Sequence, residues 1–361
     1  MNNLKKLLAL VLALAMCLAL AACGSSEKPA EQPAAEEPAA EQPAAEEPAE
    51  EPAAEEPAEE PAADGQTYTI GICQLMQHDA LDAATQGFED ALTEKLGDAV
   101  TFDLQNAQGD SATCSTIVTG FVSNEYDLIM ANATPALQAA ISATSEIPIL
   151  GTSVTDYATA LNDPEMDATV GTGINVSGTS DGVSAQLYAD LVKELVPDVA
   201  KVSILYCSAE ANSVLQAEQF TECMEAMGAT CTTYTFADSN DIQSVVTAAI
   251  EDCDALYIPT DNTAASNMTI VSNACAPAGI PVICGEENMC GNGGLATVSI
   301  SYYDIGYMCG EQAYEILVNG ADVSAMPIGY STNPVKKYNA DYAAAIGFTM
   351  PEGFEAIAAA E

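Results

Sequence analysis

Short apolar runs rich in β-branched residues alternate with longer stretches whose apolar residues recur every three or four positions, from about residue 67 to residue 320. The short runs predict buried strands, and the longer stretches predict amphipathic helices. In one helical stretch Leu81, Ala84, Phe88 and Leu92 form a single apolar stripe. Regular alternation of this kind is typical of parallel sheets covered by helices, so we expect an α/β protein.

The pattern predicts two successive sets of elements. The first has strands at 67–73, 99–105, 127–131 and 147–152 and helices at 79–96, 110–123 and 134–145. After a Gly- and Ser-rich passage around 171–184, the second has helices at 184–195, 212–227, 239–252 and 262–277 and strands at 201–206, 230–236, 254–258 and 280–284. A glycine-rich turn at 285–294, a strand at 295–300, a helix at 302–319 and a short tail follow. We expect two Rossmann-like lobes with parallel sheets and about three crossings: lobe 1 from 66–176 plus about 295–322, and lobe 2 from 177–294 plus about 323–350.

The amino terminus has the layout of a signal peptide. Lys5 and Lys6 precede an apolar run over residues 7–22 that stops at Cys23. This run is shorter than the roughly 20 residues that span a bilayer as a helix. The sequence at residues 20–23, Leu-Ala-Ala-Cys, resembles a bacterial lipobox. We therefore expect residues 1–22 to be cleaved and Cys23 to carry a lipid that anchors the chain to the outer face of a membrane, with an ordinary cleaved signal as the alternative.

Residues 23–65 are predicted to form a disordered tether. From residue 27 to residue 64 the units Glu-Glu-Pro-Ala-Ala and Glu-Gln-Pro-Ala-Ala recur, and no large apolar side chain is present. Recurrent proline stops helices, and the carboxylates repel one another, so an extended polyproline-like segment is expected.

The charge of the chain limits the classes of molecule that it can bind. Its formal net charge is −45 at pH 7, which makes nucleic acid a poor partner. The eight basic residues are all lysine. Without a guanidinium group, a ligand carboxylate must be held by backbone N–H groups, hydroxyls or a helix amino terminus.

Twelve cysteines are present, including Cys23 and one inside the signal peptide. The others contain no Cys-x-x-Cys spacing, and several lie within strand or helix patterns, such as Cys73, Cys223 and Cys309. We interpret them as small buried apolar residues, with a disulfide between Cys284 and Cys290 as the alternative.

Polar residues follow most of the predicted strands. Because ligands of open parallel sheets bind beyond the carboxyl ends of the strands, these junctions supply the candidate site. The residues that we select for ligand binding are Gln74, His78, Thr134, Ser153, Asp156, Asn212, Ser213, Thr260, Asp261 and Glu286. Each of them could instead be a helix cap or a turn residue.

Five segments of the chain, taken in sequence order, resemble the substrate-binding components of ABC importers. The resemblance is to the branch that includes tryptophan- and tyrosine-binding lipoproteins. The five segments are His78-Asp-Ala-Leu-Asp with Gln86-Gly-Phe, Ala133-Thr-Pro, Asn175-Val-Ser-Gly, Ala209-Glu-Ala-Asn-Ser and Pro259-Thr-Asp-Asn. The resemblance covers roughly residues 67–350. It implies a type I periplasmic-binding-protein fold, an amino-acid-like ligand in the cleft, and delivery to a permease with its ATPase.

A zwitterionic ligand would need donors for its carboxylate and an acid for its ammonium group. We assign the carboxylate to Thr134 and Ser153 of the first lobe with Asn212 and Ser213 of the second. We assign the ammonium to Asp261, with Asp156 and Glu286 behind it. The chain has no tryptophan, so an aromatic platform would come from Tyr157, Tyr206 or Tyr303.

His78 is the only histidine, and no second histidine, Gly-x-Ser-x-Gly motif or Cys and His cluster accompanies it. Nucleophilic and zinc chemistry need such partners, so we predict no catalytic residues, no metal and no cofactor, and interpret His78 as a cleft wall or a helix-entry residue. The segment Gly291-Asn-Gly-Gly lacks the lysine of a phosphate loop and is expected to form a turn near a lobe crossing.

An extracytoplasmic binding protein that works as a monomer is the function that fits best. The alternatives are a ligand-sensing receptor subunit with the same clamp fold, a secreted hydrolase and a structural surface lipoprotein. The hydrolase is disfavoured because the catalytic constellation is missing.

Overall fold

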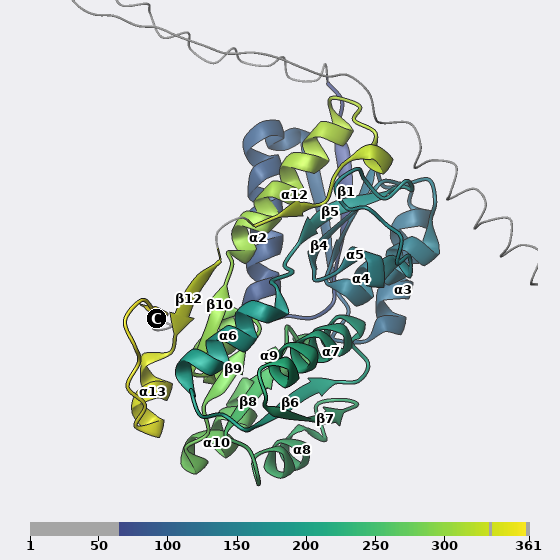
Figure 1. Cartoon of the computed structure of the whole chain (residues 1–361). Coiled ribbons are helices and arrows are strands. Elements are labelled where there is room, and N and C mark those ends of the chain that lie inside the picture. The colour runs from purple at the N-terminus through teal and green to yellow at the C-terminus, as the bar shows by residue number, and fades with distance from the viewer. Residues whose placement is uncertain (1–64, 332–333, 359–361) are drawn as a thin grey trace, which may run out of the picture. The chain divides into compact units, whose positions relative to one another are not determined.

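The computed structural model describes residues 65–331 and 334–358, which form two α/β lobes (Figure 1). The predicted signal peptide, the lipidated Cys23 and nearly all of the tether lie outside these residues. No helix in the described ranges is long and apolar enough to cross a bilayer.

Lobe 1 is built on a six-stranded parallel sheet with the order β11-β5-β4-β3-β1-β2. Its strands are β1 (Tyr68–Gln74), β2 (Val100–Asn106), β3 (Leu128–Asn132), β4 (Ile149–Val154), β5 (Val176–Ser180) and β11 (Gly329–Tyr330). Its helices are α2 (Asp79–Leu96), α3 (Ser111–Ser123), α4 (Thr134–Ala143), α5 (Tyr157–Leu161) and α12 (Tyr302–Leu317). The faces of β1 explain this layering: Ile70 and Ile72 pack with Phe88 of α2, whereas Cys73 packs with Cys114 of α3.

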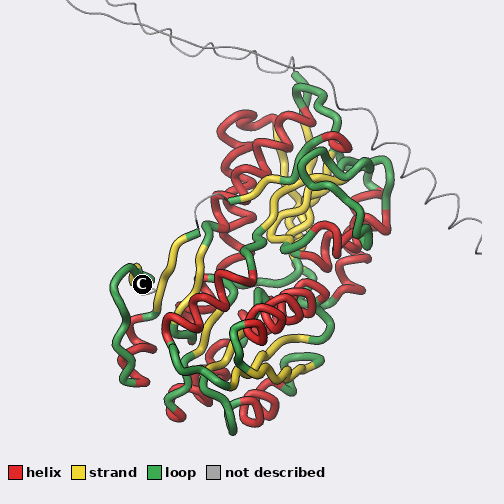
Figure 2. Tube along the Cα trace, viewed as in Figure 1, coloured by secondary structure: helices red, strands yellow, loops and turns green. Residues whose placement is uncertain are grey.

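Lobe 2 is built on a seven-stranded sheet with the order β13-β12-β10-β9-β8-β6-β7, in which only the β10–β12 pair is antiparallel among the described strands. Its strands are β6 (Lys201–Cys207), β7 (Thr230–Phe236), β8 (Ala255–Ile258), β9 (Val282–Cys284), β10 (Ala296–Ser299), β12 (Val335–Tyr338) and β13 (Glu355–Ala356). Its helices are α6 (Ala185–Leu195), α7 (Ala211–Ala226), α8 (Ile242–Ala249), α9 (Asn262–Ala265), α10 (Met268–Ala278), α11 (Glu287–Gly293) and α13 (Ala340–Ile346). Figure 2 shows helices flanking the strands of both lobes.

The chain passes between the lobes three times, which agrees with the predicted number of crossings. The crossings lie between β5 and α6, between β10 and α12, and between β11 and β12. The predicted fold class, two α/β lobes with mostly parallel sheets, is confirmed.

Sheet membership differs from the expected lobe division at two strands. The range 295–322 was assigned to lobe 1, but β10 pairs with β9 in the sheet of lobe 2. The range from 323 onward was assigned to lobe 2, but β11 pairs with β5 in the sheet of lobe 1. Each of these short strands joins the sheet of the lobe that the chain is about to leave, so a boundary drawn by element type alone misplaces it.

Three other local predictions need correction. The helix predicted at 262–277 is two helices, α9 and α10. The glycine-rich segment 285–294 was expected to be a turn, but it contains α11, whose amino terminus is capped by Glu286. The Gly- and Ser-rich passage contains β5, a strand with short polar side chains such as Ser177 and Thr179 that are fully buried.

All ten cysteines of the described residues are free thiols, and seven of them are buried. Cys284 and Cys290 are among the buried ones and are not bonded to each other. Burial together with the neighbouring Cys290 thiol raises the pKa of Cys284. The structure therefore agrees with the interpretation of these residues as small apolar side chains.

A tight contact between two helices holds the late part of the chain to lobe 1. Helices α2 and α12 lie side by side (Figure 1). A Cβ atom at Gly306 of α12 would lie 2.0 Å from the carbonyl oxygen of Ala84, and one at Gly87 of α2 would lie 2.1 Å from the carbonyl oxygen of Tyr303. Only glycine allows the two backbones to approach this closely.

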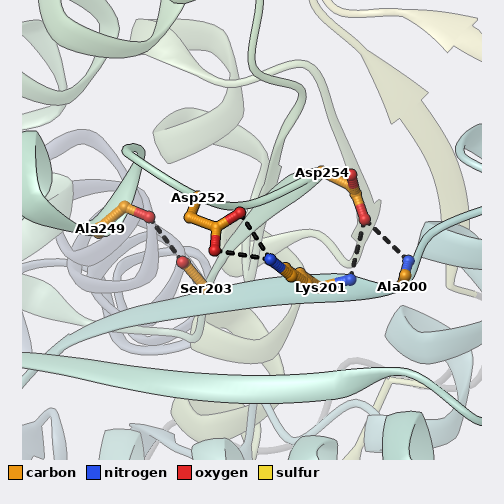
Figure 3. A network of polar contacts seen from close by, with 6 residues as sticks. All are labelled: Ala200, Lys201, Ser203, Ala249, Asp252 and Asp254. Atoms are coloured by element: carbon orange, nitrogen blue, oxygen red, sulfur yellow. Dashed lines mark hydrogen bonds and ion pairs between the residues drawn. The ribbon is translucent and has the colours of Figure 1, made fainter.

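The amino end of β6 is tied to the loop before β8 by a polar network (Figure 3). The Asp254 carboxylate accepts hydrogen bonds from the backbone N–H groups of Ala200 and Lys201, both at 2.8 Å. The Lys201 ammonium pairs with Asp252 at 2.6 Å, and both of these side chains are more than half exposed. This network lies at the sheet edge opposite the carboxyl ends of the strands.

We expect Asp254→Ala to lower the free energy of unfolding by about 1 kcal/mol at pH 7, because two backbone donors lose their acceptor at a solvent-exposed position. These donors lower the pKa of Asp254. Its contribution is therefore present above the carboxyl's unfolded pKa and is lost as the pH falls through the lower folded value. Urea titrations at pH 7 and in acid measure this. Asp252→Ala, which removes an exposed ion pair, should have a much smaller effect, and equal effects would contradict the assignment.

Candidate ligand-binding site

A polar pocket lies between the two lobes, where strands of both sheets end. We call it the inter-lobe pocket, and its cavity is small, about 10 Å³. It is lined by His78, Leu81, Ser153, Thr155, Asp181, Asn212, Thr260, Asp261, Asn262, Ala265, Glu286 and Tyr302. The lining residues come from junctions after β1, β4, β5, β6, β8, β9 and β10. This is the position that the geometry of open parallel sheets favours for a ligand.

Three buried polar atoms of the pocket residues have no hydrogen-bond partner among the described residues. They are the Ser153 hydroxyl Oγ, the Asp181 carboxylate oxygen Oδ1 and the Asn212 amide oxygen Oδ1. A buried polar atom without a partner costs about 1–3 kcal/mol, so proteins rarely retain several in one place. One donor and two acceptors together form a site prepared for a small polar ligand.

Ser153 also has an unusual backbone. Its φ angle is +55°, and the pairing of β4 with β5 shifts its register between Gly151 and Val154. The left-handed conformation costs energy for a residue other than glycine. In this case it places a serine hydroxyl in the pocket at the end of a buried strand.

Asp181 is held by the hinge region of the molecule. It follows β5 on the first crossing, and its Oδ2 accepts a hydrogen bond of 2.7 Å from the hydroxyl of Tyr302, which follows the second crossing. Burial raises the pKa of Asp181, while the Tyr302 and Thr155 hydroxyls lower it. The second oxygen, Oδ1, is buried without a partner, so it can accept hydrogen bonds from a ligand.

The carboxylates of Asp261 and Glu286 have a different role, because both cap helices. Asp261 accepts hydrogen bonds from the N–H groups of Ala264 at 2.8 Å and of Cys207 at 2.7 Å. Glu286 accepts one from Asn288 at 2.6 Å and another from Met289. Burial raises the pKa of each carboxyl group to about 8.

The electrostatics of the inter-lobe pocket favour a cation. Three carboxyl groups line it, and no lysine is among the described residues around it. The only basic side chain in the pocket lining is His78. Burial lowers the pKa of His78, which favours its neutral form. A ligand ammonium group beside these carboxyl groups would favour their ionised form, which burial alone disfavours.

Side chains also meet across the pocket from the two lobes. The His78 nitrogen Nε2 lies 3.1 Å from the Asn262 oxygen Oδ1. At the exposed rim, Asn292 of α11 donates to Asp79 of α2 at 3.1 Å. The two lobes are therefore in direct contact around the pocket.

Six of the ten sequence candidates line the inter-lobe pocket. They are His78, Ser153, Asn212, Thr260, Asp261 and Glu286. The other four do not line it: three have internal partners, whereas the buried hydroxyl of Thr134 has no hydrogen-bond partner among the described residues. Gln74 bonds with Asp82 and Thr85, Thr134 begins α4, Asp156 caps α5 through the N–H of Thr159, and Ser213 donates to the Thr260 carbonyl.

The three tyrosines expected to provide an aromatic platform do not line the inter-lobe pocket. The hydroxyl of buried Tyr157 donates to the Gly151 carbonyl oxygen, Tyr206 is half-buried on β6, and Tyr303 points outward to Asp90. Tyr302 lines the pocket instead. Neighbouring side chains of a helix point about 100° apart, so in the first turn of α12 Tyr302 faces the pocket and Tyr303 does not.

Six residues of the pocket lining were not among the candidates selected from the sequence. These are Leu81, Thr155, Asp181, Asn262, Ala265 and Tyr302. Thr155 and Asn262 lie in strand-to-helix junctions that the sequence indicated as part of the site. The neighbouring residues Asp156 and Asp261 were selected in place of them. Asp181 could have been found only by recognising β5, because it is the first residue after that strand.

Comparison with known proteins gives consistent results. A family model described as ABC transporter substrate binding protein matches residues 69–360. The tyrosine-binding protein of Clostridioides difficile (strain R20291) is 38% identical over 262 residues, which are 72% of this chain and 75% of that protein.

Two solved structures show similar folds. The ABC domain from Streptococcus pneumonia in complex with L-Trp is 32% identical, with a TM-score of 0.76 over 81% of this chain and 100% of that one. The ligand-free, open structure of a substrate-binding protein with adhesive properties from Clostridium difficile is 36% identical, with a TM-score of 0.62 over the same shares.

The fold is that of the type I periplasmic binding proteins, and the matched family consists of solute-binding proteins and not of enzymes. This chain therefore belongs to the family of ABC transporter substrate-binding proteins.

Proposed function

We propose that this protein captures an amino acid in the inter-lobe pocket and delivers it to the permease of an ABC importer. The observation that carries the proposal is the set of three unpaired polar atoms on Ser153, Asp181 and Asn212, buried around one acidic pocket. Two relatives support an amino acid as the ligand, since one is named for tyrosine and one was solved with L-Trp.

The ligand ammonium group is assigned to Asp181 and Asn212, whose two Oδ1 atoms are free acceptors. This replaces the assignment to Asp261 from the sequence, because both oxygens of Asp261 already accept backbone N–H bonds. The ligand carboxylate is assigned to the Ser153 hydroxyl, which comes from the opposite lobe to Asn212. A ligand that contacts both lobes stabilises their closed arrangement.

The ligand side chain is assigned to the apolar part of the lining, which consists of Leu81, Ala265 and the ring of Tyr302. A tyrosine ring offers a face for stacking or an edge contact with another aromatic ring. An aromatic amino acid is therefore the favoured ligand class, and it agrees with the names of the relatives.

We place the mature protein on the extracytoplasmic face of the cell membrane. The lipobox-like sequence that ends at Cys23 supports a lipid anchor, and the Glu, Pro and Ala repeat supports a spacer between this anchor and the binding domain. We propose that the protein acts as a monomer, because each chain contains both walls of the inter-lobe pocket.

A calorimetric titration of the purified protein tests the ligand assignment. L-tyrosine, L-tryptophan and L-phenylalanine should bind, and saturation at 100 times the dissociation constant should stabilise the protein by about 2.7 kcal/mol. N-acetyl-L-tyrosine lacks the ammonium group and tyramine lacks the carboxylate, so both should bind much more weakly. If neither group matters, or if sugars bind better than any amino acid, the proposed function is wrong.

A further inference from the structure

The contact between His78 and Asn262 joins the two lobes directly across the inter-lobe pocket. His78 lies immediately before α2 of lobe 1, and Asn262 begins α9 of lobe 2. Their side chains meet at 3.1 Å, and the Asn262 residue is only 8% exposed. A hydrogen bond at such a place forms only when the lobes are closed.

A buried carboxylate fixes the orientation of Asn262. Glu210 accepts bonds from the backbone N–H of Asn262 at 3.0 Å and from its Nδ2 at 2.7 Å. It also accepts from the backbone N–H of Thr263 at 2.9 Å and from the Thr263 hydroxyl at 2.8 Å. With Nδ2 bound to a carboxylate, the Asn262 oxygen must be the atom that faces lobe 1.

The orientation of Asn262 in turn fixes the state of the histidine. An amide oxygen only accepts hydrogen bonds, so the Nε2 of His78 must carry a hydrogen. Burial lowers the pKa of His78, although Asn262 and the charges of Glu210, Asp82 and Asp79 oppose that shift. The neutral Nε2–H tautomer therefore satisfies the contact without burying an additional charge.

We propose that Glu210, Asn262 and His78 form a latch that holds the two lobes closed over the bound ligand. This inference rests on the proposed function, because the molecule that the latch retains is the proposed amino-acid ligand. Glu210 positions Asn262 in lobe 2 before closure, so little side-chain entropy is lost when His78 arrives from lobe 1. The latch forms whenever the lobes close, with or without the ligand, and it slows the escape of a ligand that has entered.

Dissociation kinetics test the latch in the full chain, with L-tyrosine as the probe. His78→Ala should accelerate dissociation about tenfold and leave the association rate nearly unchanged. His78→Gln should restore slow dissociation, since the glutamine Nε2 can donate from a similar position. Asn292→Ala removes an exposed contact between the lobes and serves as the control, with an expected change of less than twofold.

A second measurement separates the latch from the identity of the ligand. Hydrogen exchange of the segments 76–82 and 260–266 without any ligand should be faster in His78→Ala and unchanged in His78→Gln. If wild-type protein binds no amino acid but the exchange pattern holds, the proposed function fails and the latch stands. If His78→Ala matches wild type in dissociation and in exchange, or if His78→Ala and Asn262→Ala have additive effects in a double-mutant cycle, the latch is overturned.

Discussion

Replacement of Asp181 by asparagine is expected to weaken binding of the amino-acid ligand at least about 30-fold. The variant keeps the size of the side chain but removes the charge that we assign to the ligand ammonium group, and a buried charge that loses its partner costs about 2–5 kcal/mol. Calorimetry with L-tyrosine at pH 7 measures the change. The ligand-free variant should unfold no more easily than wild type, since burial already disfavours the charged form of Asp181.

Asp156→Asn is the matched control for this substitution. Asp156 follows β4 of the same lobe and was also selected from the sequence, but it caps α5 through Thr159 and does not line the pocket. Its replacement should change the affinity less than threefold. Equal losses for the two variants, or an Asp181→Asn protein that binds like wild type, would show that the ammonium group is held elsewhere.

Gly306→Ala is expected to lower the free energy of unfolding by at least about 2–3 kcal/mol. The added methyl group would lie 2.0 Å from the carbonyl oxygen of Ala84, and backbone cannot rotate aside as a flexible side chain can. Helices α2 and α12 must then separate, which opens the packing around Phe88 and Cys309. Denaturant titration followed by circular dichroism measures the loss.

The same substitution at Gly120 should act in the opposite direction. Gly120 lies within α3, and a Cβ atom added there meets nothing within 4 Å. Alanine is a better helix former than glycine by about 0.5–1 kcal/mol, so Gly120→Ala should leave stability unchanged or raise it. A destabilisation similar to that of Gly306→Ala would mean that the helix contact is not the cause.

Much of the fold could be predicted because most elements have clear periodicity. The strand predicted at 230–236 and the helix predicted at 79–96 match β7 and α2 at both ends. Prediction failed where a buried element lacks large apolar side chains. Strand β5 was missed because it contains serines and a glycine, and α11 was missed because it contains two glycines, although the capping carboxylate of Glu286 marks where it begins.

The site could be located from the sequence more readily than the roles of its residues could be assigned. Strand ends carry polar residues for two reasons, capping and ligand contact, and the sequence does not separate them. Asp156 and Asp261 have the same residue type and the same position before a helix, yet only Asp261 reaches the inter-lobe pocket. Distinguishing Asp181 requires knowledge of which buried atoms have no partner, and this depends on how the two lobes meet.

The late return of the chain to lobe 1 has a consequence for biosynthesis. Helix α12 and strand β11 belong to lobe 1 but follow nearly all of lobe 2 in the sequence, while β12 and β13 complete lobe 2 only after that. A growing chain therefore cannot finish its first lobe until residue 330 has been made. We therefore expect both lobes to stay incompletely folded until late in synthesis, which would keep the polypeptide able to pass through a narrow export channel.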